Sequence, residues 1–251
     1  MIHRSARREE IAEAANVLAR LGLVTAFGHV SARAGDAMLI TPAVDLGRVT
    51  AAEVLEVPLR TADSLPAGVP AEAWVHLALY RARPDTAAIA RAQPPSAYAV
   101  TAAATSLVPL HGQAAWLGEW VPVHDDATLL RSPGLAERAA RSLPSGEALL
   151  LRGNGALTLG ATAGIAVARM WLLAAACEVY LAASQAFGPS VTPLSADEIA
   201  SWRAAGSELL PRLWDHLRRR PGAAGPAVGR GSRNEPAGPR APDLHLPHRL
   251  G

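Results

Sequence analysis

Apolar residues recur along the chain at two spacings, which predict helices mixed with short strands. One amphipathic helix is expected at residues 4–21, with an apolar face formed by Ile11, Ala14, Ala15, Leu18 and Ala19. Further helices are expected at 73–81, 135–143 and 163–184, with one or two more within 195–219. Short apolar runs predict strands at 38–40, 54–57, 86–90, 121–124, 148–151 and 156–159.

Proline and glycine mark where several of these elements end. Pro84 follows the helix expected at 73–81, and the Pro-Pro pair at 94–95 follows the strand expected at 86–90. The residue before a proline avoids helical geometry. Asn154 and Gly155 lie between two apolar runs, and an Asn-Gly pair in that setting is a strong signal for a β-hairpin. The helix at 163–184 is apolar on nearly all sides, which predicts that it is buried.

The predicted elements do not follow a regular strand–helix–strand rhythm, which favours a mainly antiparallel sheet. The predicted fold class is therefore α/β in the broad sense (α+β), a single domain with a central, mainly antiparallel sheet flanked by helices. We expect this domain to cover residues 1–205, followed by a C-terminal helical extension at 206–220. Residues 221–251 are rich in Pro, Gly and Arg, a composition typical of disorder.

The composition excludes several kinds of chemistry. All 24 basic residues are arginine, so no lysine is available for a Schiff base or for an internal aldimine with pyridoxal phosphate. Cys177 is the single cysteine, which excludes an intrachain disulfide and a thiolate metal cluster. Its apolar neighbours predict a small, buried side chain.

Charge and hydropathy favour a cytoplasmic protein. The chain is 50% hydrophobic and 18% charged, with a net charge of +2. The arginines at 218–220 have few aromatic residues near them, which indicates a solvated segment rather than a nucleic-acid interface. No uninterrupted apolar stretch reaches the roughly 18 residues of a membrane span. We therefore expect neither nucleic acid nor a membrane as a partner.

Several segments share their order and spacing with one known family. The segments at 28–33, 38–42, 72–85, 87–95, 109–111 and 121–123 resemble the class II aldolase/adducin family, in particular its fuculose-phosphate aldolases. The resemblance covers residues 8–205 and implies the fold of that family. It also implies a small-molecule substrate and a homotetramer, with each active site between neighbouring subunits.

The resemblance places three polar residues where the family carries its metal-binding histidines. The family's His-x-His pair corresponds to Arg91 and Gln93 here, and its third histidine corresponds to Asn154. The family norm is a divalent metal such as zinc, but a guanidinium has no lone pair to offer a metal and repels a cation. We therefore expect no metal and no other cofactor.

Glu72 is the expected acid/base residue, because it precedes His76 by four residues as the family's catalytic glutamate precedes a helix histidine. The alternative is a glutamate that only marks the start of a helix, where the helix dipole favours a negative charge. Trp74 is a candidate substrate contact two residues further on. His76 itself is interpreted as a satisfied core histidine.

Arg91 and Gln93 alternate with Ala90 and Ala92, so they are expected on one face of a strand. A guanidinium there can hold a carboxylate or a developing oxyanion. The alternative is an interior salt bridge between Arg91 and Glu72.

Three further residues are candidate substrate contacts, each with a structural alternative. His29 contacts a ligand or caps its turn, and His111 lies at the active-site rim or in a loop without a role. Asn154 contacts a ligand or only serves the hairpin turn, which favours Asn before Gly.

The first functional hypothesis is a metal-independent lyase with aldolase, decarboxylase or dehydratase chemistry next to a carbonyl. Its substrate is expected to lack a phosphate, because the family's phosphate-binding amide and hydroxyls are replaced. An enzyme of this kind fits secondary metabolism. The alternative is a non-catalytic scaffold or binding protein comparable to adducin. A second alternative is a metal-dependent aldolase with a rearranged site built from His29, Glu72, His76 or His111.

Overall fold

The computed structural model describes residues 2–60, 64–188 and 191–220. Its centre is one eight-stranded sheet with the strand order β3-β2-β1-β4-β8-β7-β6-β5. The strands are β1 (His29–Ala34), β2 (Ala37–Ile40), β3 (Leu55–Pro58), β4 (Ala88–Ala92), β5 (Ser106–Leu107), β6 (Val121–His124), β7 (Ala148–Leu151) and β8 (Gly155–Gly160). All neighbouring strands are antiparallel except β6 and β7. The predicted mainly antiparallel sheet flanked by helices is confirmed.

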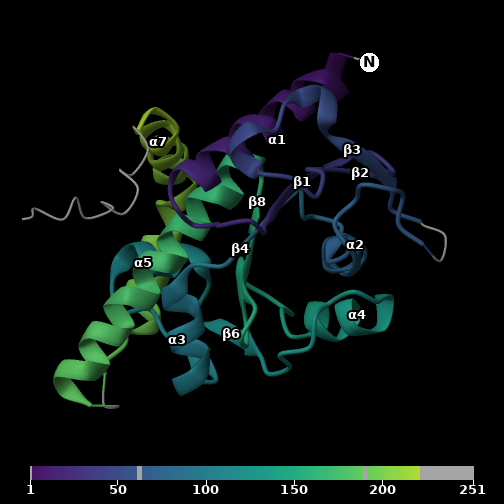
Figure 1. Cartoon of the computed structure of the whole chain (residues 1–251). Coiled ribbons are helices and arrows are strands. Elements are labelled where there is room, and N and C mark those ends of the chain that lie inside the picture. The colour runs from purple at the N-terminus through teal and green to yellow at the C-terminus, as the bar shows by residue number, and fades with distance from the viewer. Residues whose placement is uncertain (1, 61–63, 189–190, 221–251) are drawn as a thin grey trace, which may run out of the picture.

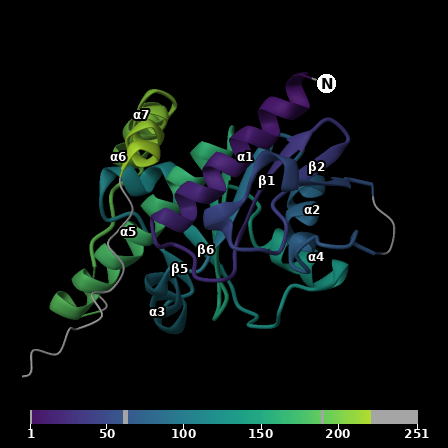
Figure 2. The same ribbon diagram turned by 45° about the horizontal axis from the view of Figure 1, so that its top comes forward.

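Helices cover both faces of the sheet, as Figures 1 and 2 show. One face packs against α1 (Ile2–Arg20), α3 (Pro95–Ala103) and α5 (Ala163–Phe187). Helix α7 (Gly206–Arg219) packs against α5 and α1. The other face packs against α2 (Ala73–Ala82) and α4 (Pro133–Arg141). The remaining helix is α6 (Ala196–Ala204), and three 3-10 turns are η1 (Leu46–Arg48), η2 (Ala51–Glu53) and η3 (Gly112–Leu117).

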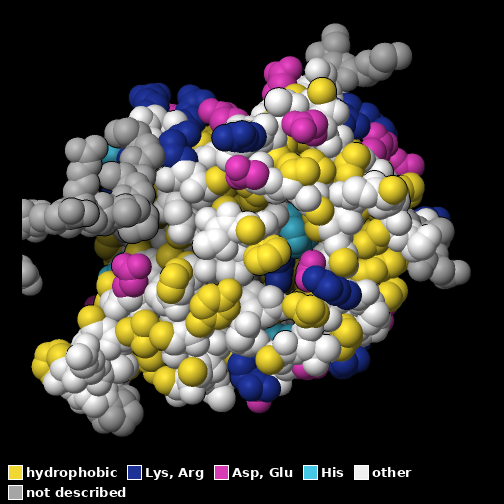
Figure 3. Space-filling model, in the orientation of Figure 1, with side chains coloured by type: hydrophobic (Ala, Val, Ile, Leu, Met, Phe, Trp, Pro, Cys, Tyr) yellow, Lys and Arg dark blue, Asp and Glu magenta, His cyan; other side chains and the backbone are white. Residues whose placement is uncertain are grey.

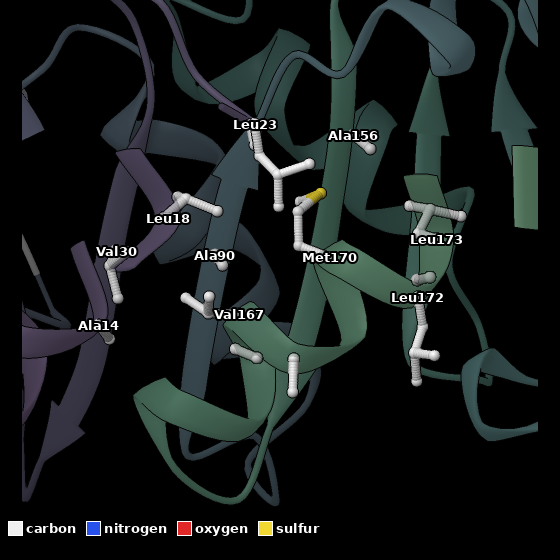
Figure 4. Packing of buried hydrophobic residues seen from close by; sticks show 14 of the residues in the cluster. Ala14, Leu18, Leu23, Val30, Ala90, Ala156, Val167, Met170, Leu172 and Leu173 are labelled. Atoms are coloured by element: carbon white, nitrogen blue, oxygen red, sulfur yellow. The ribbon is translucent and has the colours of Figure 1, made fainter. Parts of the chain in front are cut away.

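The larger hydrophobic core lies between α5 and the middle of the sheet. Val167 and Met170 of α5 lie beside Ala90 of β4 and Leu18 of α1 in Figure 4. Ile89 belongs instead to the second core, under α2 and α4. Because side chains alternate along a strand, β4 sends alanines into one core and its other side chains toward α2.

Helix α5 is buried only along its first part. Burial holds as far as Cys177, whose thiol has its pKa raised to about 12 by desolvation. Val179 and Phe187 are exposed beyond it, so the prediction of burial up to residue 184 is wrong there. By length and mean hydropathy of 1.6, α5 is also the one helix of the described residues that could cross a membrane. Its buried half packs in the core against β4, β8, α1 and α3.

Most predicted elements are present, but some are shifted or were missed. The helix expected at 135–143 runs two residues earlier, at Pro133–Arg141. The strand expected at 86–90 runs two residues later, at Ala88–Ala92. The short strand β5 was not predicted, nor was α3, which begins at Pro95 where a proline is tolerated in the first turn. Strand β1 was also missed, because its inward-facing residues include the polar His29 and Ser31. The two helices α6 and α7 lie in the segment where one or two were expected, and the tail at 221–251 lies outside the described residues.

Candidate active site

Arg91 is the centre of a buried polar cluster on the α2 side of the sheet. It lies directly opposite His29 in the register of β4 and β1, so the two side chains share one face. Arg91 is only 3% exposed. Its Nη2 donates to Oδ1 of Asn154 at 2.7 Å, and its Nη1 donates to Oε1 of Gln93 at 2.8 Å when the Gln93 amide is oriented to satisfy both neighbours.

Two donors of this cluster have no hydrogen-bond partner. They are Nε of Arg91 and Nδ2 of Asn154, both fully buried. Buried polar groups are nearly always hydrogen-bonded, and an unpaired donor costs about 1–3 kcal/mol. These two neighbouring donors therefore lack an acceptor among the described residues.

Glu72 does not form the alternative salt bridge with Arg91. Its Oε1 accepts from Nε of Arg131 at 3.1 Å, and Arg131 is the more exposed partner, at 58% against 13%. Glu72 also occupies the N-terminal cap of α2, where its side chain makes no capping hydrogen bond. Burial lowers the pKa of Arg91, and the negative charge of Glu72 opposes that shift. Glu72 therefore lies near the guanidinium without neutralising it by direct contact.

A chain of hydrogen bonds leads from this cluster into the interior. Nδ1 of His29 lies 3.0 Å from Nε2 of His76, and Nδ1 of His76 lies 2.7 Å from Oγ of Ser31. Oγ of Ser31 lies 2.9 Å from the hydroxyl of Tyr80. His29 and Ser31 come from β1, whereas His76 and Tyr80 lie one turn apart on α2.

Both imidazoles are held in the neutral form. Burial, followed by the positive charge of Arg91, lowers the pKa of His76 to about 3. The same two causes and the neighbouring His76 place the pKa of His29 well below its ordinary value. The expectation that His76 is a satisfied core histidine is confirmed by its two bonded nitrogens. His29 does not cap its turn, because its Nδ1 faces His76.

The hairpin of β7 and β8 positions Asn154 beside Arg91. The hairpin itself is confirmed, but Asn154 does not adopt the left-handed backbone that an Asn-Gly turn would require. Gly153 and Gly155 take the positive φ angles of 64° and 85° instead. Gly155 also lies so close to β4 that a Cβ atom would fall 2.2 Å from the carbonyl oxygen of Ala92. The turn therefore leaves the Asn154 amide free to bond Arg91.

Two of the predicted contact residues lie away from this cluster's hydrogen bonds. Trp74 is buried in the core under α2. His111 precedes η3, which packs against α6, and burial lowers its pKa. Substrate contact by Trp74 and His111 stays a prediction.

Ser31, Tyr80 and Arg131 belong to the site and were not foreseen from the sequence. Ser31 follows His29 by two residues and Tyr80 follows His76 by four, so both spacings place them on the same face as a predicted site residue. The loop position of Arg131 carries no comparable signal.

A hollow is visible near the middle of one face of the molecule. Figure 3 shows that a histidine side chain lies at its base, with basic and acidic side chains beside it. This is the face on which β1 and β4 meet α2 (Figure 1).

The side chains of this cluster are poor ligands for a metal ion. Arg91 is cationic and offers no lone pair, and the amide oxygens of Gln93 and Asn154 face its guanidinium. His29 and His76 bond each other rather than converge on a common point. No group of three His, Cys, Asp or Glu side chains with metal-binding geometry occurs within residues 2–60, 64–188 and 191–220.

Comparisons with known proteins agree on one family. The family described as "Class II Aldolase and Adducin N-terminal domain" matches residues 9–181. A 3,4-dihydroxyphthalate decarboxylase of Terrabacter sp. (strain DBF63) is 29% identical over 181 residues, which cover 66% of this chain and 76% of that protein. Decarboxylase NovR of Streptomyces niveus is 33% identical over 137 residues, or 54% of this chain, and the chain spans only 50% of its length.

Solved structures show the same fold. The l-fuculose-1-phosphate aldolase of Thermus thermophilus superposes with a TM-score of 0.66 at 28% identity, covering 76% of this chain and 100% of that one. An aldolase II superfamily protein of Pseudomonas syringae has a TM-score of 0.72 at 23% identity, covering 86% and 92%.

Proposed function

The chain belongs to the class II aldolase and adducin family, and we propose that it is a metal-independent lyase that decarboxylates a non-phosphorylated organic acid. The relatives named as decarboxylases support this reaction class. The 3,4-dihydroxyphthalate named for two of them supports a hydroxylated aromatic acid as the substrate.

One observation carries the proposal. Arg91 is a buried guanidinium whose hydrogen-bond partners are two neutral amide oxygens, and among the described residues no carboxylate forms an ion pair with it. Burying a charge costs several kcal/mol unless a counter-charge compensates it. A substrate oxyanion can supply that counter-charge, with the free donors of Arg91 and Asn154 as its contacts.

In the proposed reaction these donors stabilise the charge that develops on the substrate. A hydroxyaryl acid loses its hydroxyl proton to the carboxylate of Glu72, and the resulting oxyanion is held by Arg91 and Asn154. Glu72 then returns the proton to the ring carbon that bears the carboxylate. The bond from that carbon to the carboxylate breaks, carbon dioxide leaves, and the electron pair restores the aromatic ring. Solvent finally protonates the oxyanion, so no oxidant and no metal takes part.

The histidine chain gives the site a second way to move a proton. If His76 donates through Nδ1 to Ser31, its Nε2 accepts from Nδ1 of His29, and Nε2 of His29 is left as a base. In the reverse arrangement the Tyr80 hydroxyl donates to Ser31 and Ser31 donates to Nδ1 of His76. Nε2 of His76 then donates to Nδ1 of His29, and Nε2 of His29 carries the hydrogen and is a donor. We infer that this chain of hydrogen bonds determines whether Nε2 of His29 carries a hydrogen beside the bound oxyanion.

Location and assembly are part of the proposal. A cytoplasmic homotetramer fits this family, and exposed apolar side chains such as Phe27, Trp120 and Phe187 are available for subunit contacts.

The proposal is tested with purified protein and a panel of hydroxybenzoic, hydroxyphthalic and β-keto acids. Carbon dioxide release is measured before and after exhaustive treatment with a chelator, with metal content determined on the same samples. We expect one class of acid to be decarboxylated at a rate that chelation leaves unchanged. Loss of activity on chelation and its return with zinc would overturn metal independence.

Two variants separate the roles of the site residues. Arg91→Gln should lower kcat by roughly a hundredfold, as for a removed oxyanion donor. Glu72→Gln should abolish turnover while ligand binding persists. The control Arg152→Gln removes an arginine paired with exposed Asp125 and should retain the activity. Binding without turnover by the unmodified protein would favour the adducin-like alternative, and no binding of any acid would refute the proposal.

A further inference from the structure

A second cavity lies at the Gly160 end of β8. It has a volume of about 540 Å³ and is lined by the start of α5, the junction of α6 and α7, and η3. Gly155 at one end of β8 lies against β4 beside Gln93, whereas Gly160 at the other end lines the cavity. Arg91 lies opposite Leu157, three residue steps or about 10 Å along β8 from Gly160. Neither Arg91, Gln93 nor Asn154 lines the cavity, so the two sites are separate.

Positive charge exceeds negative charge around this cavity. Its lining contains Arg83, Arg169 and Arg203 but only two carboxylates, Asp85 and Glu147. Asp85 is 75% exposed, so water screens its charge. Burial lowers the pKa of Arg169, and repulsion from the other two arginines adds to that shift. The local excess of positive charge favours an anion.

Two buried donors in the lining have no partner. Oγ1 of Thr86, a residue that is 5% exposed, forms no hydrogen bond, and neither does Nε of Arg169. The remaining bonds of Arg169 go to Glu147 at 3.1 Å and to the carbonyl of Leu159 at 2.8 Å. Arg203 has no ion-pair partner within the described part of the chain. Unpaired buried donors are rare and call for an acceptor.

The lining of the cavity also includes apolar side chains. They are Trp116, Leu159, Ile165 and Leu210. The indole nitrogen of Trp116 is already bonded to the carbonyl of Trp202 at 2.7 Å, which fixes the ring. An apolar wall with a few convergent polar groups is typical of a small-molecule site.

We propose that this cavity binds a small organic anion, in which a ring lies against Trp116 and a carboxylate or phosphate group lies between Arg169, Arg203 and Thr86. The ligand is held at a site that the decarboxylation does not use.

The test measures binding of phenyl phosphate by calorimetry, with inorganic phosphate and phenol as probes of the two halves. Phenyl phosphate should bind more tightly than either. Arg203→Gln and Thr86→Val should each weaken its binding roughly threefold to tenfold, the cost of one exposed ion pair or one hydrogen bond. Because the Thr86 hydroxyl has no partner, Thr86→Val should fold with undiminished stability.

Two controls locate the ligand. Arg141→Gln removes an exposed arginine of α4 and should leave the affinity unchanged, as should Arg91→Gln. Equal affinity in Arg203→Gln, Thr86→Val and the unmodified protein would overturn the proposal. So would a loss of binding in Arg91→Gln, because the anion would then occupy the other site. Neither result decides the decarboxylation, which is tested separately by carbon dioxide release.

Discussion

Acid should destabilise this protein through its buried histidines, and His76 gives the effect a magnitude. The pKa of His76 is about 3 in the folded protein, against about 6.5 in an unfolded chain. Between these values the unfolded state binds a proton that the folded state does not. The stabilisation is therefore complete above about pH 6.5 and is lost as the pH falls toward 3.

The loss at about pH 5 amounts to about 2 kcal/mol from His76 alone. His29 shifts in the same direction and adds to it. The assay is urea unfolding followed by circular dichroism at about pH 7.5 and about pH 5, with the free energy of unfolding extrapolated to water.

Carboxylates also contribute to acid unfolding, so the variant His76→Phe isolates the histidine. It should be less stable at neutral pH by about 1–3 kcal/mol, because Ser31 and His29 lose a partner. Between the two pH values, however, it should lose about 2 kcal/mol less than the unmodified protein. The matched control His216→Gln removes an exposed histidine and should keep the full loss. The reasoning fails if His76→Phe and the unmodified protein lose the same stability.

Three further expectations follow from the geometry of the site and its surroundings. The combined changes Arg91→His, Gln93→His and Asn154→His should create a zinc site that raises the free energy of unfolding by roughly 2–4 kcal/mol in excess zinc; unchanged stability would show that the backbone differs from the family's geometry. Gly155→Ala should lower the free energy of unfolding by more than the roughly 1–3 kcal/mol of a strained backbone, because its Cβ meets β4. In the control Gly35→Ala the Cβ meets no neighbouring atom, and equal unfolding midpoints of the two variants would contradict this prediction. Light scattering should show a tetramer, and a clean monomer would exclude it.

Local alternation in the sequence correctly predicted six of the eight strands and the shared face of Arg91 and Gln93. Arg91 and Gln93 do lie on one face of the β4 segment, with Ala90 and Ala92 in the opposite core. The hairpin before Gly155 was also correctly placed. Patterns of this kind are fixed by the geometry of a single strand or turn.

The partners of these residues could not be predicted, because they depend on distances between elements. The ion pair of Glu72 with Arg131 joins residues 59 positions apart, and Arg131 lies in a loop without a periodic pattern. The contact of His29 with His76 requires β1, which the apolar pattern did not reveal. A strand whose buried face carries histidine and serine reads as a loop until its polar partners are known.

Arg91 and the less deeply buried Arg169 differ in how their charges are compensated. Arg169 is paired with Glu147 at 3.1 Å, so a counter-charge offsets much of the cost of burying its guanidinium. Arg91 is buried more deeply, yet it contacts only the amides of Asn154 and Gln93, while the nearby Glu72 pairs with a different arginine. Amide dipoles orient a guanidinium but leave its net charge in place. The folded protein therefore retains a positive charge at Arg91 beside two buried donors that have no partner, and the proposed oxyanion site rests on this feature.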